Sequence, residues 1–271
     1  MRRKRSHTRQ IMSLWESIPG HRGMSVLDAG AGKGLTTRML LDLGMKPTAT
    51  TFGTERDERL PPEAAHVGGV DLNARWPFAD ASFDGINLKD VFEHLENPAH
   101  VVRECARILK PGGYLVLSTP NILNAGSRLR LFATGFFQGW KRPLSYAKEP
   151  GNADNVYMTN LHQLHYLLAQ SGMSWDAMAA DPAEWHALLT AAVCYPLFWL
   201  GAWLATARVR RKDMLFTRDR EDIPEAKQEE LRGQQAHLQR RLRKLLLSRE
   251  ALLSRNLLVR ARKTGGSPFD A

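Results

Sequence analysis

The chain has 271 residues, of which 43% are hydrophobic and 24% charged, a balance typical of a globular protein rather than a disordered one. Its formal net charge of +10 makes nucleic acid or anionic lipid a plausible partner, and charge alone does not separate the two. The two cysteines, Cys105 and Cys194, are too few for a disulfide framework and favour a reducing compartment.

The first fifteen residues are basic but lack the apolar stretch of a signal peptide, so we expect a cytosolic protein. Short apolar runs that end at glycine or proline then alternate with segments of helical spacing. This alternation predicts a mostly parallel sheet covered by helices on both faces. In chain order we expect a helix at 7–18, a strand at 24–30, a helix at 35–44, strands at 48–53, 66–72 and 83–90, a helix within 97–113 that ends before Pro111, a strand at 114–120, a helix at 160–173, and strands at 174–181 and 256–263.

Three glycines at alternate positions follow the first predicted strand, in the stretch VLDAGAGKG. Gly30 and Gly32 would let a ligand lie against the main chain, and Gly34 would let the next helix pack closely. A tight structural turn is the alternative explanation. The GxGxG spacing differs from the GxGxxG dinucleotide fingerprint, which makes a nicotinamide-dependent reductase a poor fit.

Three acidic residues indicate what the ligand carries. Asp28 precedes the glycines and suits a positive amino group, and Glu55 lies past the second strand, where a carboxylate can accept both ribose hydroxyls. Asp71 follows the third strand, within reach of an adenine amino group. S-adenosylmethionine combines an ammonium group, a ribose and an adenine.

With these motifs the chain resembles the class I S-adenosylmethionine-dependent methyltransferases over about residues 20–175. The resemblance rests on four stretches in the usual order: VLDAGAGKG, FGTE, VDLNARWPFADASFDGINLKDVFEHLENP and ILKPGGYLVLSTPN. It implies a Rossmann-like α/β fold with a seven-stranded sheet in the order 3-2-1-4-5-7-6. One departure is Glu55, because aspartate is commoner there. The cofactor-binding residues that it implies are Asp28, Gly30, Gly32, Gly34, Glu55, Asp71, Leu72, Asn87 and Leu88, with Asn87 and Leu88 facing the sulfonium.

Catalysis in this family is mainly alignment of a nucleophile with an activated methyl group. A hydroxyl acceptor also needs a general base, for which His94 is the candidate; the alternative is a histidine that bonds a backbone carbonyl. Asp90, Glu93 and His94 also resemble the divalent-metal ligands of quinone O-methyltransferases, but an EH pair here is widespread in relatives that need no metal. We therefore expect no metal.

The segment 122–160 lies where related enzymes build a lid over the acceptor. The stretch TPNILNAGSRLRLFATGFF, followed by NLHQLHYLLAQSGM, resembles a subgroup of bacterial methyltransferases linked to glycan and lipid modification. The side chains that could meet sugar or phosphate groups, or alternatively be surface cations over an apolar patch, are Arg128, Arg130, Trp140 and Tyr157.

Residues 187–207 form an uncharged run long enough to cross the hydrocarbon layer of about 30 Å. A single crossing would separate the two last strands, which must pair in one sheet. We therefore expect the run to enter and return, with a bend at Pro196 and Gly201, or to lie flat at the interface. The alternatives are a helix buried in the protein and a homodimer contact.

A basic region follows this run, with 17 Lys/Arg against 8 Asp/Glu between residues 208 and 263. We predict a methyltransferase domain at 1–183 plus 256–263, a membrane-associating and basic helical insertion at 184–255, and a flexible tail at 264–271. The predicted function is O-methylation of an amphiphilic, lipid-linked or glycan acceptor, at the cytoplasmic face of the inner membrane. The alternatives are an RNA methyltransferase and a non-catalytic membrane scaffold that retains the fold.

Overall fold

The computed structural model describes residues 2–137, 155, 157–181, 185–218, 243–244 and 246–264. Outside the described residues therefore lie residues 138–154 and 156 of the predicted lid, which include Trp140, residues 184, 219–242 and 245 of the predicted insertion, and residues 265–271 of the predicted tail. For residues 2–6, 185–186 and 205–218 only the course of the helix is described.

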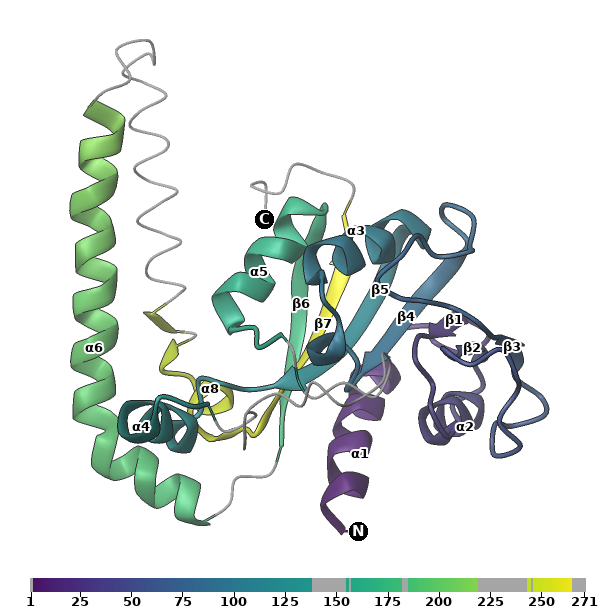
Figure 1. The fold of residues 1–271 in the computed structure, drawn as a ribbon, viewed down its shortest axis with the longest axis horizontal. Helices are drawn as coiled ribbons and strands as arrows, with labels where there is room; N and C mark the ends of the chain where they lie inside the picture. Colours follow the sequence, from purple (N-terminus) through teal and green to yellow (C-terminus); the bar gives the residue numbers. More distant parts are fainter. Residues whose placement is uncertain are drawn as a thin grey trace.

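A single sheet organises the described chain, with seven strands in the order β3-β2-β1-β4-β5-β7-β6 (Figure 1). The pairs from β3 to β5 are parallel, and β7 runs antiparallel to both β5 and β6. The predicted fold class and strand order are confirmed. The strands are β1 Ser25–Asp28, β2 Lys46–Thr50, β3 Ala65–Val67, β4 Phe83–Lys89, β5 Leu109–Pro120, β6 Met173–Ala180 and β7 Asn256–Lys263.

Helices cover both faces because consecutive strand residues point to opposite sides of the sheet. Val26 and Val116 pack with Trp15 of α1 (Arg2–Glu16) on one side, whereas Leu27 and Leu117 join a larger core on the other.

The helices are α1 Arg2–Glu16, α2 Leu35–Asp42, α3 Pro98–Ile108, α4 Ala125–Thr134, α5 Leu161–Gln170, α6 Trp185–Arg218 and α8 Arg249–Leu253, with a 3₁₀ turn η1 at Phe92–His94.

The fifth strand begins earlier than the sequence predicts. Leu109 already pairs with Phe83, and the register then jumps so that Tyr114 pairs with Gly85. The predicted Gly112–Gly113 turn is therefore a bulge within β5, with Gly112 at a φ of 79°.

The apolar run forms part of α6, a single helix of 34 residues. It bends once beside α4 and continues without turning back (Figure 1), so the expected reversal at Pro196 and Gly201 does not occur within the described helix. Only 11% of the segment Ala187–Leu204 is buried within the protein. Among the described residues, α6 is the one helix that is long and apolar enough to cross a membrane. A helix enclosed by the protein core is excluded by this exposure.

Candidate functional site

The loop between β1 and α2 holds the three glycines at the carboxyl edge of the sheet. All three have a left-handed backbone, with φ of 70° at Gly30, 54° at Gly32 and 75° at Gly34. A Cβ on Gly34 would lie 3.0 Å from the Leu60 Cα, and one on Gly30 would lie 2.8 Å from Val91 Cγ2, whereas one on Gly32 would meet nothing within 4 Å. Gly34 is thus required by packing, and Gly32 leaves bare main chain facing open space.

Asp28 lies behind this loop with only 2% of its surface exposed. Its Oδ2 accepts a hydrogen bond from Thr37 Oγ1 at 2.6 Å, and its Oδ1 accepts one from Asn87 Nδ2 at 2.8 Å. Burial raises the pKa of Asp28, although both hydrogen bonds oppose this. The carboxylate therefore stabilises the start of the loop through internal hydrogen bonds. Its burial and these two bonds favour this structural role over direct contact with a ligand.

Asn87 and Leu88 were expected to face the sulfonium, and the structure places their side chains elsewhere. Asn87 points to Asp28 on one side of β4, and its Oδ1 accepts a hydrogen bond from Trp15 Nε1 at 3.2 Å. Leu88 is buried in the larger core on the opposite side. Because β4 continues to Lys89, the first residue past the strand is Asp90.

The two acids expected to bind ribose and adenine both lie in exposed loops. Glu55 comes five residues after the end of β2 and makes no hydrogen bond or ion pair with any described residue. Asp71 accepts a hydrogen bond from the Asn73 amide at 2.9 Å, next to the buried Leu72. Both carboxylates are therefore accessible to a ligand at this edge.

The η1 turn follows β4 and carries the candidate base. His94 is exposed there, and its ring makes no hydrogen bond within the described part of the chain. Glu93 is buried, and its Oε2 has no hydrogen-bond partner among the described residues. Burial, together with the negative charge of Asp90, raises the pKa of Glu93 to about 7.

The metal candidates Asp90, Glu93 and His94 do not assemble into a site. The Asp90 carboxylate is bonded to His7, Lys89 and Ser118, whereas Glu93 is enclosed and His94 faces solvent. No group of three His, Cys, Asp or Glu side chains in the described ranges could hold a metal ion.

Of the four predicted lid residues, Arg128 has a structural role. Its guanidinium donates to the carbonyls of Leu123 and Leu246 and stacks over the Phe198 ring at 5.0 Å, which ties α4 to α6. The Tyr157 amide donates to the Glu93 carbonyl at 3.0 Å, so this part of the lid segment reaches η1.

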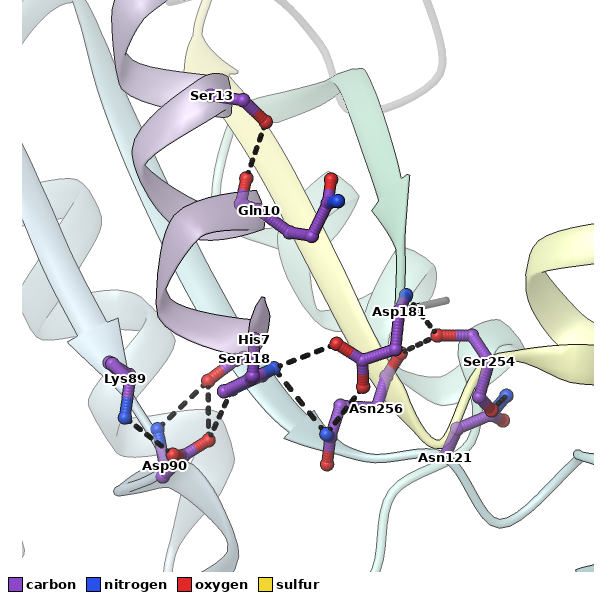
Figure 2. Close-up of polar contacts among 10 residues, drawn as sticks. All are labelled: His7, Gln10, Ser13, Lys89, Asp90, Ser118, Asn121, Asp181, Ser254 and Asn256. Carbon is purple, nitrogen blue, oxygen red and sulfur yellow. Dashed lines mark hydrogen bonds and ion pairs between the residues drawn. The ribbon is translucent and has the colours of Figure 1, made fainter. Parts of the chain in front are cut away.

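Sequence reasoning missed the threonines that shape the loop and a polar cluster around His7 (Figure 2). Thr50 Oγ1 accepts from the Gly30 amide at 3.0 Å, and Thr37 bonds Asp28 as described. A polar residue at the last position of β2 is the signal that could have indicated Thr50. The His7 contacts join residues 83 and 174 positions apart, and no local pattern marks them.

Residues 27–117 match the protein family described as a methyltransferase domain, and they run from β1 through most of β5. This part of the chain is thus similar to a methyltransferase domain, and the observed strand order is the one expected for the class I methyltransferase fold. The exposed main chain at Gly32 and the accessible carboxylates of Glu55 and Asp71 fit S-adenosylmethionine, the cofactor of that class.

The methyltransferase domain is also similar to curated proteins. A ubiquinone biosynthesis O-methyltransferase of Xanthomonas oryzae pv. oryzae is 32% identical over 110 residues, which are 36% of this chain and 44% of that protein. The chain thus spans less than half the length of the curated relative.

Two solved structures share the fold. A S-adenosylmethionine-dependent methyltransferase from Archaeoglobus fulgidus is 13% identical, with a TM-score of 0.51 over 94% of this chain and 92% of that one. A Burkholderia thailandensis 1,6-didemethyltoxoflavin-N1-methyltransferase, solved with its substrate and S-adenosylhomocysteine, is 15% identical, with a TM-score of 0.50 over 95% of this chain and 78% of that one.

Proposed function

We propose that this protein transfers a methyl group from S-adenosylmethionine to an oxygen of an amphiphilic acceptor, lipid-linked or glycan in nature, at the cytoplasmic face of the membrane. The observation that carries the enzymatic part is the open main chain at Gly32, together with the accessible carboxylates of Glu55 and Asp71 in exposed loops after β2 and β3.

Some residues of the chain would bind the cofactor, and others would take part in proton transfer. Gly30 and Gly32 would receive the methionine part, Glu55 the ribose, and Asp71 with Leu72 the adenine. The cofactor supplies an already activated methyl group. His94, exposed on η1, is the candidate base for the acceptor hydroxyl, and the neighbouring Glu93 has a pKa that burial raises to about 7.

The membrane part rests on two exposed apolar helices. Phe132 of α4 is 90% exposed, and Val193 and Leu197 of α6 are 71% and 68% exposed. Figure 1 shows that α4, the start of α6 and the N-terminus of α1 lie at the end of the molecule to which β4 and β5 point. The site would therefore face the surface on which these helices rest. The further exposed apolar side chains are Leu129 of α4, Phe136 just past its end, and Leu188, Leu189, Tyr195, Trp199, Leu200, Trp203 and Leu204 of α6.

Charge and topology favour a surface location over a lone crossing. A helix of 34 residues is about 50 Å long, but β6 and β7 on either side of α6 are paired in one sheet, so the chain returns to the same side. The basic sequences RRKR at 2–5 and RVRRK at 208–212 suit anionic headgroups.

The activity is tested by incubating the purified protein with methyl-labelled S-adenosylmethionine and a membrane extract of the source organism. We expect label in a lipid-soluble product, and no label with Gly32→Arg. Label in RNA instead would support the alternative of an RNA methyltransferase. Absence of cofactor binding by the wild type would support a non-catalytic scaffold.

Membrane docking is tested by co-sedimentation with vesicles of phosphatidylglycerol and phosphatidylcholine. The variant Phe132→Ser/Trp199→Ser/Trp203→Ser should lose most of the binding. Phe52→Ser is the matched control, because Phe52 is 59% exposed in the loop after β2, far along the sheet from α4 and α6. Equal binding by the two variants would contradict the proposed surface.

A further inference from the structure

We propose that His7 is a positioning residue, which ties α1 to the carboxyl edge of the sheet and, through Asp90, holds the turn that supports both the cofactor loop and the candidate base. The inference rests on the proposed function only where it concerns the cofactor.

His7 bridges two carboxylates that come from different parts of the sheet (Figure 2). Its Nε2 lies 2.9 Å from Asp90 Oδ1, just past β4, and its Nδ1 lies 3.2 Å from Asp181 Oδ1, just past β6. Asn256, the first residue of β7, donates to Asp181 Oδ2 at 2.7 Å. One imidazole thus connects α1 with the ends of three strands.

Asp90 needs such support because its backbone is left-handed, with a φ of 53°. This conformation is uncommon and costly outside glycine, and it persists only where surrounding contacts hold it. Besides His7, Ser118 Oγ donates to Asp90 Oδ1 at 2.8 Å and accepts from the Asp90 amide at 2.9 Å. Lys89 Nζ bonds Asp90 Oδ2 at 2.7 Å.

The turn at Asp90 leads directly into the cofactor loop and the candidate base. Val91 packs against the bare Cα of Gly30, where a Cβ would come within 2.8 Å of its Cγ2. Glu93 and His94 follow within four residues. If Asp90 relaxed to an ordinary backbone, Val91 would move away from Gly30 and η1 would shift with it.

The charges around His7 keep this arrangement intact near neutral pH. Burial by itself lowers the pKa of His7, but the hydrogen bonds and charges of Asp181 and Asp90 raise it to about 9. The other charged groups facing the cluster are Lys89, which bonds Asp90, and Glu93. Because the folded-state pKa lies above the ordinary 6.5, the contribution of His7 is complete below about pH 6.5 and is lost as the pH rises through about 9.

The first experiment measures the affinity for S-adenosylhomocysteine, the product that the cofactor becomes after methyl transfer. It is titrated into wild type, His7→Leu and the control Ser13→Ala. Ser13 lies on the same helix, and among the residues that the structure describes its hydroxyl bonds only the Gln10 carbonyl of that helix. We expect binding about tenfold weaker for His7→Leu and unchanged for Ser13→Ala. Wild-type affinity should also fall between pH 8 and 10, whereas that of His7→Leu should stay level; identical pH profiles would overturn the proposal.

The second experiment needs no cofactor. An NMR titration of the wild-type imidazoles should give one histidine with a midpoint near pH 9, identified as His7 by its absence from the His7→Leu spectrum. A midpoint near 6.5 would overturn the proposal. If the wild type bound no S-adenosylhomocysteine, the proposed function would fail, but this titration would still decide the role of His7.

Discussion

Asn87 and Asp28 join the ends of β4 and β1 through a buried hydrogen bond of 2.8 Å from the Asn87 amide to Asp28 Oδ1. The two residues are also backbone partners in the sheet, and the Ala29 amide bonds the Asn87 carbonyl at 2.9 Å. The first residue of the glycine loop is therefore fixed to the strand that leads to Asp90 and η1. These bonds connect the glycine loop to the strand that carries the turn.

Asn87→Leu should destabilise the protein, because it leaves two buried polar groups unpaired, Asp28 Oδ1 and Trp15 Nε1. We expect a loss of about 2–3 kcal/mol in the free energy of unfolding, measured by urea denaturation. The control is Trp15→Phe, which removes one donor and leaves the bond to Asp28 in place. Equal losses for the two variants would show that the bond between β1 and β4 contributes little.

The glycine loop predicts losses of stability of different size for two small substitutions. Gly34→Ala should lower stability by roughly 2 kcal/mol or more, because its Cβ would come within 3.0 Å of the Leu60 backbone in addition to the cost of the left-handed conformation. Gly32→Ala should cost only about 1 kcal/mol, since its Cβ meets no atom within 4 Å. Thermal unfolding of the two variants, compared with wild type, measures the difference; a larger loss for Gly32→Ala would contradict this view of the loop.

Glu93 should make stability depend on pH. Burial raises its pKa from 4.5 to about 7, so the folded protein binds a proton that the unfolded chain has released in this range. By linkage, its contribution to stability falls as the pH rises from about 4.5 through 7. Glu93→Gln removes the titrating group and should flatten this part of the profile of unfolding free energy against pH. A slope unchanged in the variant would show that another group causes it.

The fold was largely predictable because each strand carries its own local signal. The runs VLD, INL and YLVLS are apolar, and glycine or proline marks their ends. Helix α4 was not predicted, although Asn124 caps it and Gly135 follows it. Its apolar residues Leu129 and Phe132 are exposed, as is Phe136 just past its end, and without a buried apolar face they produce no clear helical periodicity.

The sequence predicts those parts of the candidate site that depend on backbone conformation. It does not predict those that depend on contacts between side chains far apart in the chain. The spacing of Gly30, Gly32 and Gly34 alone indicates a loop with an unusual backbone, and all three are left-handed in the structure. By contrast, the contacts of Asp28 depend on Thr37 and Asn87, and only the folded sheet brings Asn87 next to it. The inward orientation of Asn87 and Leu88 follows from β4 continuing to Lys89, a boundary that the sequence does not mark.

The measurement that tests the central claim most directly is a calorimetric titration of S-adenosylmethionine into wild type and Gly32→Arg. The Gly32 position has room for a side chain, so the variant should fold, and the arginine would occupy the space in front of the bare main chain. We predict saturable binding to the wild type and at least a hundredfold loss in the variant, or roughly 3 kcal/mol. Wild-type affinity in the folded variant would contradict the assignment of this loop as the cofactor site.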